Sequence, residues 1–106
     1  MSIKTLAPIT VTAANTATRI TATATPCQEV TFQADPDNQA AIWLGDSAVG
    51  SSSTDRGFLL SVTDGDAFPS FVKFAAYSGA NPINLADFWV MSLHATAKIN
   101  VIYIQV

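Results

Sequence analysis

The sequence predicts a single all-β domain, an antiparallel β-sandwich or barrel, and three observations carry this prediction. Runs rich in β-branched and aromatic residues recur along the chain and are separated by turn residues. No amphipathic repeat of helical length interrupts them. The chain has 106 residues, close to the commonest domain size and long enough to bury a core. The expected strands span residues 28–33, 41–45, 57–63, 86–93 and 98–106.

Residues 1–25 differ in composition from the sandwich body expected over residues 26–106. They are rich in threonine and alanine, and the threonines from Thr10 to Thr25 recur largely at every second position. This spacing places side chains on one face of a strand. Two interpretations stay open: an ordinary pair of strands joined at Ala14-Asn15, or an extended arm that adds to the sheet of a neighbouring subunit.

Turn residues separate the expected strands. Pro26 ends the N-terminal segment because proline cannot donate a hydrogen bond to a ladder. Asp35-Pro36-Asp37-Asn38 indicates a turn, and Asp64-Gly65-Asp66 indicates a hairpin. Two loops are expected, at Ser47–Gly57 and at Tyr77–Leu85. Between them an edge or irregular strand is expected, with Phe71, Val72 and Phe74 following Pro69.

The composition favours a protein whose surface is partly covered by partners. Charged residues make up 12% of the chain and hydrophobic residues 49%, whereas about 25% of an ordinary soluble protein is charged. The net charge of -3 argues against nucleic-acid binding, because such a face needs clustered basic residues. The basic residues are instead scattered along the chain: Lys4, Arg19, Arg56, Lys73 and Lys98.

No membrane association is expected either. No run approaches the roughly 20 apolar residues of a spanning helix. The start of the chain, Met1-Ser2-Ile3-Lys4, lacks the apolar core of a signal peptide. We therefore expect synthesis and folding in a cytoplasm.

The residues that could carry chemistry do not form a catalytic motif. Cys27 is the only cysteine, which excludes an intrachain disulfide and a multi-cysteine zinc site. We expect it to be a small buried hydrophobe, since a nucleophile would need His94, the only histidine, nearby. The turns at 35–38 and 64–66 hold aspartates that could bind calcium, but aspartate is also an ordinary turn residue. Ser51-Ser52-Ser53 lacks the G-x-S-x-G elbow. We expect no enzyme activity and no cofactor.

Exposed aromatic residues would be the sign of a carbohydrate-binding platform. Trp43 and Trp89 lie in strands between aliphatic residues, which predicts core positions for both. Tyr77 lies beside Ser78-Gly79 in an expected loop and is the better candidate for an exposed contact.

Several of these runs together resemble small β-rich proteins encoded among the structural genes of tailed phages. The resemblance covers about residues 17–106 and consists of turn and strand residues. The matching runs are Ala17-Thr18-Arg19-Ile20, Thr25-Pro26-Cys27, Val30 to Pro36, Trp43-Leu44-Gly45-Asp46, Gly57-Phe58-Leu59-Leu60 and Gly65 to Pro69.

The resemblance implies a virion component made in the host cytoplasm. It implies a jelly-roll-like sandwich that serves as a head decoration or cement protein on the capsid surface. Such a subunit binds the major capsid protein as a homo-oligomer, with a trimer favoured and a dimer possible. No catalytic residues belong to the pattern, so none are assigned. The alternatives are a neck or tail ring component, and a carbohydrate- or receptor-binding module of a phage particle.

Low charge and the Thr/Ala-rich segment suit a subunit that buries much of its surface against neighbours. We therefore expect the apolar residues of the N-terminal segment to pack between subunits, and Tyr77 to contact a partner from its loop. The expected partner-binding residues are Ile3, Leu6, Ile9, Val11, Ile20 and Tyr77.

Overall fold

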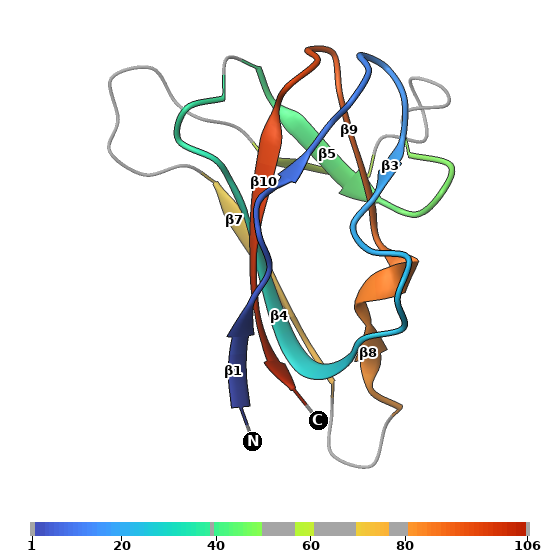
Figure 1. Ribbon diagram of the computed structural model, residues 1–106, viewed down its shortest axis with the longest axis vertical. Coiled ribbons are helices and arrows are strands. Elements are labelled where there is room, and N and C mark those ends of the chain that lie inside the picture. The colour runs from blue at the N-terminus through green and yellow to red at the C-terminus, as the bar shows by residue number, and fades with distance from the viewer. Residues whose placement is uncertain (1, 39, 50–56, 61–69, 77–80, 106) are drawn as a thin grey trace.

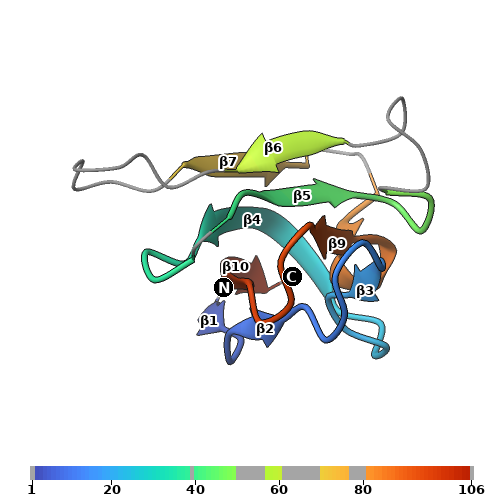
Figure 2. The same ribbon diagram turned by 90° about the horizontal axis from the view of Figure 1, so that it is seen from above.

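The computed structural model describes residues 2–38, 40–49, 57–60, 70–76 and 81–105. These residues form two antiparallel sheets that pack face to face (Figure 1). Figure 2 shows the same molecule from above, with β5 and β6 of one sheet on one side and β1 and β10 of the other sheet opposite them. The single-domain β-sandwich that the sequence predicts is confirmed.

Sheet A holds the longer strands. Its spatial order is β1 (Ser2–Thr5), β10 (Lys98–Gln105), β4 (Pro26–Ala34) and β7 (Phe71–Ala75). Two short strands complete it: β2 (Ile9–Thr10) pairs with β10, and β8 (Ile83–Asn84) pairs with β4. All of these pairs are antiparallel.

Sheet B is smaller. Its spatial order is β3 (Thr18–Arg19), β9 (Trp89–Ser92), β5 (Ile42–Gly45) and β6 (Phe58–Leu60). A short 3-10 helix, η1 (Leu85–Asp87), leads from β8 of sheet A into β9.

The connections repeatedly cross from one sheet to the other. Without the short strands β2 and β8, the spatial orders are β1-β10-β4-β7 and β3-β9-β5-β6. In each sheet an early strand therefore lies beside a late one: β1 beside β10, and β3 beside β9. The first and last strands are therefore neighbours, and both termini lie at the same end of the molecule (Figure 1). This nesting of eight strands in two sheets is the jelly-roll topology, so the jelly-roll-like fold implied by the resemblance is confirmed.

The core lies between the sheets and follows from alternation in the longest strands. Side chains on one strand point alternately to opposite faces, so every second residue from Val30 to Ala34 in β4 and from Ile99 to Tyr103 in β10 enters the core. In register, the paired core residues of these strands are Val30 with Tyr103, Phe32 with Val101, and Ala34 with Ile99. Sheet B contributes the buried side chains of Ile42, Leu44, Leu60 and Val90.

The N-terminal segment takes neither of its two expected forms in full. A turn does occur at Ala14-Asn15, where Asn15 has a φ of 61°. The strands on either side of it do not pair with each other, because β2 joins β10 in sheet A and β3 joins β9 in sheet B. The segment thus crosses over the end of the sandwich, and both of its halves belong to the chain's own sheets.

Three local expectations are wrong. The loop expected at Tyr77–Leu85 contains β8 and the first residue of η1. Pro26 begins β4 instead of ending a segment, a position that suits proline because the first residue of a strand need not donate. The strand expected from residue 86 begins only at Trp89. The side chain of Asn84 accepts a hydrogen bond from the Ala86 N–H and caps η1, which holds residues 85–87 out of the sheet.

The other expected strands are confirmed where the structure describes them, and β7 is an edge strand of sheet A as expected. The expected hairpin at Asp64-Gly65-Asp66 and most of the loop at Ser47–Gly57 lie outside the described residues. In the part of the chain that is described, no helix is long and apolar enough to cross a bilayer.

Candidate functional site

The residues expected to bind partners separate into three groups. Val11 and Ile20 are buried in the core of their own chain, so they cannot contact a partner in this conformation. Leu6 and Ile9 are half-buried and pack against that core. Ile3 alone projects freely, with 69% of its surface exposed. Tyr77 lies outside the described residues.

Val11 and Ile20 are buried because the strands before them join the chain's own sheets. Val11 directly follows β2, and its N–H donates to the carbonyl of Ala97; Ile20 directly follows β3, and its N–H donates to the carbonyl of Phe88. The apolar face of the N-terminal segment is therefore used within the subunit. Removing residues 1–16 would take β1 and β2 away from β10.

The exposed Ile3 belongs to a larger surface, the outward side of sheet A, which we call the A face. The register of the strands places Ile3 directly opposite Ile104, and Ile102 opposite both Thr5 and Thr31. The A face consists of Ile3, Thr5, Glu29, Thr31, Gln33, Phe71, Lys73, Asn100, Ile102 and Ile104.

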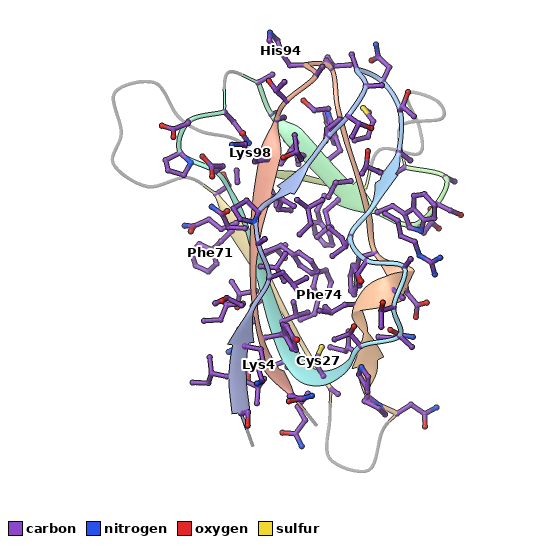
Figure 3. All side chains as sticks on the ribbon, in the orientation of Figure 1. Lys4, Cys27, Phe71, Phe74, His94 and Lys98 are labelled. Atoms are coloured by element: carbon purple, nitrogen blue, oxygen red, sulfur yellow. The ribbon has the colours of Figure 1, made fainter. Side chains whose placement is uncertain are left out.

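Four of the ten residues of the A face are apolar: Ile3, Ile102 and Ile104 on the adjacent strands β1 and β10, and Phe71 on β7. Ile102 is 45% exposed and Phe71 66% exposed. Figure 3 shows Phe71 on the outside of the sandwich and Phe74 of the same strand in its interior. Antiparallel sheets that have one face in water usually carry polar residues on it. The A face departs from that pattern along β10 and β1.

The charges on the A face neutralise each other. Lys73 Nζ lies 2.7 Å from Glu29 Oε1, across the β4–β7 pair. Both side chains are partly exposed, so this ion pair adds little stability. Its consequence is that these two charges cancel on the β4–β7 side of the A face.

Two shallow hollows flank Ile102 on this face. One, of about 270 Å³, runs towards Leu6, Gln33 and Asn100. The other, of about 170 Å³, lies towards Ile3 and Ile104. Side chains of another protein could fit into these two hollows.

The edge beside this surface is also open within the described part of the chain. β1 stands at the end of the strand order of sheet A. An edge strand presents unpaired N–H and C=O groups, which another chain can pair with.

A second candidate site lies between the sheets, beside β6 and β7, and we call it the inter-sheet cavity. It has a volume of about 530 Å³, within the usual range for ligand pockets. Its lining comes from both sheets and from η1: Leu44, Gly45, Asp46, Ala48, Val49, Gly57, Phe58, Phe74, Asp87 and Phe88.

Aromatic rings form the floor of this cavity. The ring of Phe74 lies 5.3 Å from that of Phe88 and 5.9 Å from that of Phe58, measured between centroids. Phe32, fully buried, stacks behind them at 4.8 Å from Phe88. These distances and tilted geometries are the favourable ones for aromatic pairs.

A tight turn after β5 builds the wall of the cavity. The Asp46 carboxylate accepts a hydrogen bond from the Ala48 N–H at 2.9 Å, and the Asp46 carbonyl accepts one from the Val49 N–H at 3.0 Å. This arrangement folds Val49 back against Gly45, where a side chain would already be crowded. Asp87, the last residue of η1, also lines the cavity and lies with Asp46 at its rim.

The tryptophans are half-buried instead of occupying the core positions expected for them. They lie on the outward side of sheet B, where Trp89 is opposite Gly45 and Trp43 is opposite Met91. The guanidinium of Arg19 lies 5.6 Å from the centre of the Trp89 ring, a cation–π contact that covers part of its face.

The residues considered for chemistry lie apart. Cys27 is buried, as expected, near one end of the sandwich, and His94 is exposed at the opposite end (Figure 3). Burial raises the pKa of the Cys27 thiol, which keeps it protonated. Among the described residues, no three of histidine, cysteine, aspartate and glutamate come close enough to hold a metal ion.

Neither the A face nor the inter-sheet cavity is among the sites that the sequence predicts, although the A face has a signal in the sequence. The run from Ile99 to Ile104 is apolar at nearly every position, not at alternate ones. Such runs are typical of strands that are covered on both faces. The phenylalanines of the inter-sheet cavity come from β6, β7 and the end of η1, and nothing in their spacing along the chain indicates that they meet.

Comparison with known protein families, with curated proteins and with solved structures finds no match to this chain.

Proposed function

We propose that this protein is a structural component of a phage virion, a capsid decoration protein that binds the major capsid protein and stabilises the head by contact alone. The observation that carries the proposal is the A face, where Ile3, Ile102 and Ile104 form a continuous apolar surface on the outside of a folded subunit. Leaving such a surface in water is unfavourable, so its burial drives association.

The fold and the resemblance support the same function. Jelly rolls recur in viral capsid proteins, but also in lectins and enzymes, so the topology by itself does not assign an activity. The resemblance to small tailed-phage structural proteins favours the capsid among these. The A face, as defined by its ten residues, holds no cluster of like charges, which favours a protein partner over nucleic acid or another strongly charged surface.

Self-association fits the same subunit. The open edge of β1 lies next to the apolar row of the A face, because Ile3 belongs to both. Pairing of this edge with a neighbouring copy would satisfy its backbone groups and extend the apolar surface. A trimer is favoured and a dimer is the alternative.

The test is co-sedimentation with shells assembled from the major capsid protein of the phage whose genome encodes this chain. We expect the wild-type protein to sediment with the shells in a fixed ratio, and Ile102→Glu to stay in the supernatant. Leu93→Glu is the matched control, since Leu93 is also an exposed leucine-sized side chain, at 57%, but follows β9 in sheet B. Equal binding by wild type and Ile102→Glu would contradict the proposal.

Stoichiometry on the intact particle separates the alternatives. Hundreds of copies per particle, seen at the symmetry axes by electron cryomicroscopy, would support the decoration role. A dozen copies or fewer at a vertex would assign the protein to the neck or tail. Saturable binding of a glycan at the Trp43 and Trp89 surface, with no shell binding, would replace the proposal by the carbohydrate-binding alternative.

A further inference from the structure

The inter-sheet cavity is separate from the A face and has its own chemistry. We propose that it binds a cationic side chain on an apolar stem, an arginine or lysine of a partner polypeptide. That the source is a polypeptide rests on the proposed function, whereas the chemistry of the occupant follows from the cavity itself.

The floor of the cavity requires an apolar group. Phe58 of β6 is 55% exposed, and its ring lies 5.9 Å from that of Phe74 of β7, measured between centroids. Phe88 closes the far side with its ring 5.3 Å from Phe74. An aliphatic stem laid over these rings would remove their exposed surface from water.

The rim requires a positive charge. Asp46 and Asp87 both line the cavity, and no basic residue is among its described lining. The hydrogen bond from the Ala48 N–H fixes the Asp46 carboxylate at this position. Both aspartates are exposed, and a purely apolar occupant would leave their charges without a partner. A cation at the end of the stem would pair with them at the rim and would also interact with the aromatic faces.

Arginine fits this combination better than lysine. Its guanidinium is planar, stacks on aromatic rings and forms forked hydrogen bonds with a carboxylate. The contact between Arg19 and Trp89 on the outside of sheet B is an example of the same pairing within this chain.

The test uses the full chain and two blocked peptides, acetyl-Gly-Arg-Gly-amide and its citrulline counterpart, which has nearly the same shape without the charge. Binding is followed by NMR at the amide groups of Gly45, Ala48 and Gly57. We expect the arginine peptide to shift these signals and to bind about five-fold more tightly than the citrulline peptide, a difference of about 1 kcal/mol. Equal affinity for the two peptides, or no shift at these amides, would overturn the proposal.

Variants assign the effect to individual groups. Asp46→Asn with Asp87→Asn should abolish the preference for arginine, while Phe58→Ala should weaken both peptides. The matched control is Asp37→Asn. Asp37 is an exposed aspartate in the turn after β4 that, like Asp46 and Asp87, forms no ion pair with a described residue. Loss of the preference in Asp37→Asn as well would show a diffuse charge effect and overturn the proposal.

Two further measurements distinguish a cation from this chain from one of a partner, and distinguish failure of the cavity proposal from failure of the proposed function. Arg56 directly precedes Gly57 in the sequence. Tighter peptide binding by Arg56→Gln would mean that the chain's own arginine is the occupant, against the proposal, and unchanged binding supports an external one. Arginine binding by a protein that fails to sediment with shells would refute the capsid function and leave the chemistry of the cavity standing.

Discussion

Replacing Gly57 by alanine tests whether the backbone that frames the inter-sheet cavity is as constrained as the structure indicates. Gly57 has a φ of +73°, in the left-handed region, and it leads into β6. A Cβ added there would lie 2.1 Å from the carbonyl oxygen of Leu44. That oxygen cannot move away easily, because β5 is held between β6 and β9.

Two costs add up at this position. Left-handed backbone costs a non-glycine residue about 1–2 kcal/mol, and forcing an extra methyl group into a packed site costs about 1–3 kcal/mol more. We therefore expect Gly57→Ala to lower the free energy of unfolding by about 2–5 kcal/mol. Detachment of β6 would relieve the clash, so the change should also displace Phe58 from Phe74 and alter the cavity.

The measurement is urea unfolding followed by tryptophan fluorescence, with NMR at the residues around the cavity. Gly45→Ala is the internal control: the Cβ there would lie 3.1 Å from a methyl group of Val49, a side chain that can shift. Its loss of stability should be clearly smaller. A Gly57→Ala protein as stable as wild type, or less affected than Gly45→Ala, would refute the reasoning.

Three other substitutions have defined outcomes. Asn84→Ala should lower the free energy of unfolding by about 2 kcal/mol in urea titrations, because the Asn84 side chain accepts hydrogen bonds from the N–H groups of Thr25 and Ala86, both at 3.0 Å; Asn84→Asp keeps the acceptor and should lose much less. Phe32→Ala should cost about 3–5 kcal/mol by the same assay, since Phe32 is fully buried, and a loss below about 1 kcal/mol would contradict its central place in the core. The raised pKa of Cys27 means that the folded state holds the thiol proton more tightly than the unfolded chain. The contribution of the protonated thiol to the free energy of unfolding is therefore complete below about pH 8.5 and is lost as the pH rises above that value. The difference in unfolding free energy between wild type and Cys27→Ala, measured from pH 7 to pH 10, should therefore decrease, and a constant difference would show that burial has no such effect.

The sequence by itself determined the fold class and most of the strands. The alternation of apolar and polar residues in β4, with Val30 and Phe32 on one side, is a local property that fixes which face is buried. The strand predictions held because period-two patterning depends only on neighbouring residues. Cys27 is out of phase with Val30 and Phe32, and its burial depends on the register shift between Glu29 and Cys27 in the β4–β10 pair.

Tertiary structure decided what the patterns could not. Val11 and Ile20 would show the same apolar spacing whether they faced their own core or a neighbouring subunit. The pairing of β2 with β10 and of β3 with β9 places both side chains in the core of their own chain. Trp43 and Trp89 lie in runs of apolar residues, where the local pattern does not show which side faces the core. The burial of Ile42, Leu44 and Val90 between the sheets leaves both tryptophans on the outward side of sheet B.

The two candidate sites depend on contacts between residues far apart in the chain. The A face joins Ile3 to Ile104, and the inter-sheet cavity joins Asp46 to Asp87 and Phe58 to Phe88. Sequence determines which residues each strand exposes, because alternation is local. Which exposed residues become neighbours is set by the order of strands in the two sheets, and that order results from the packing of the whole chain.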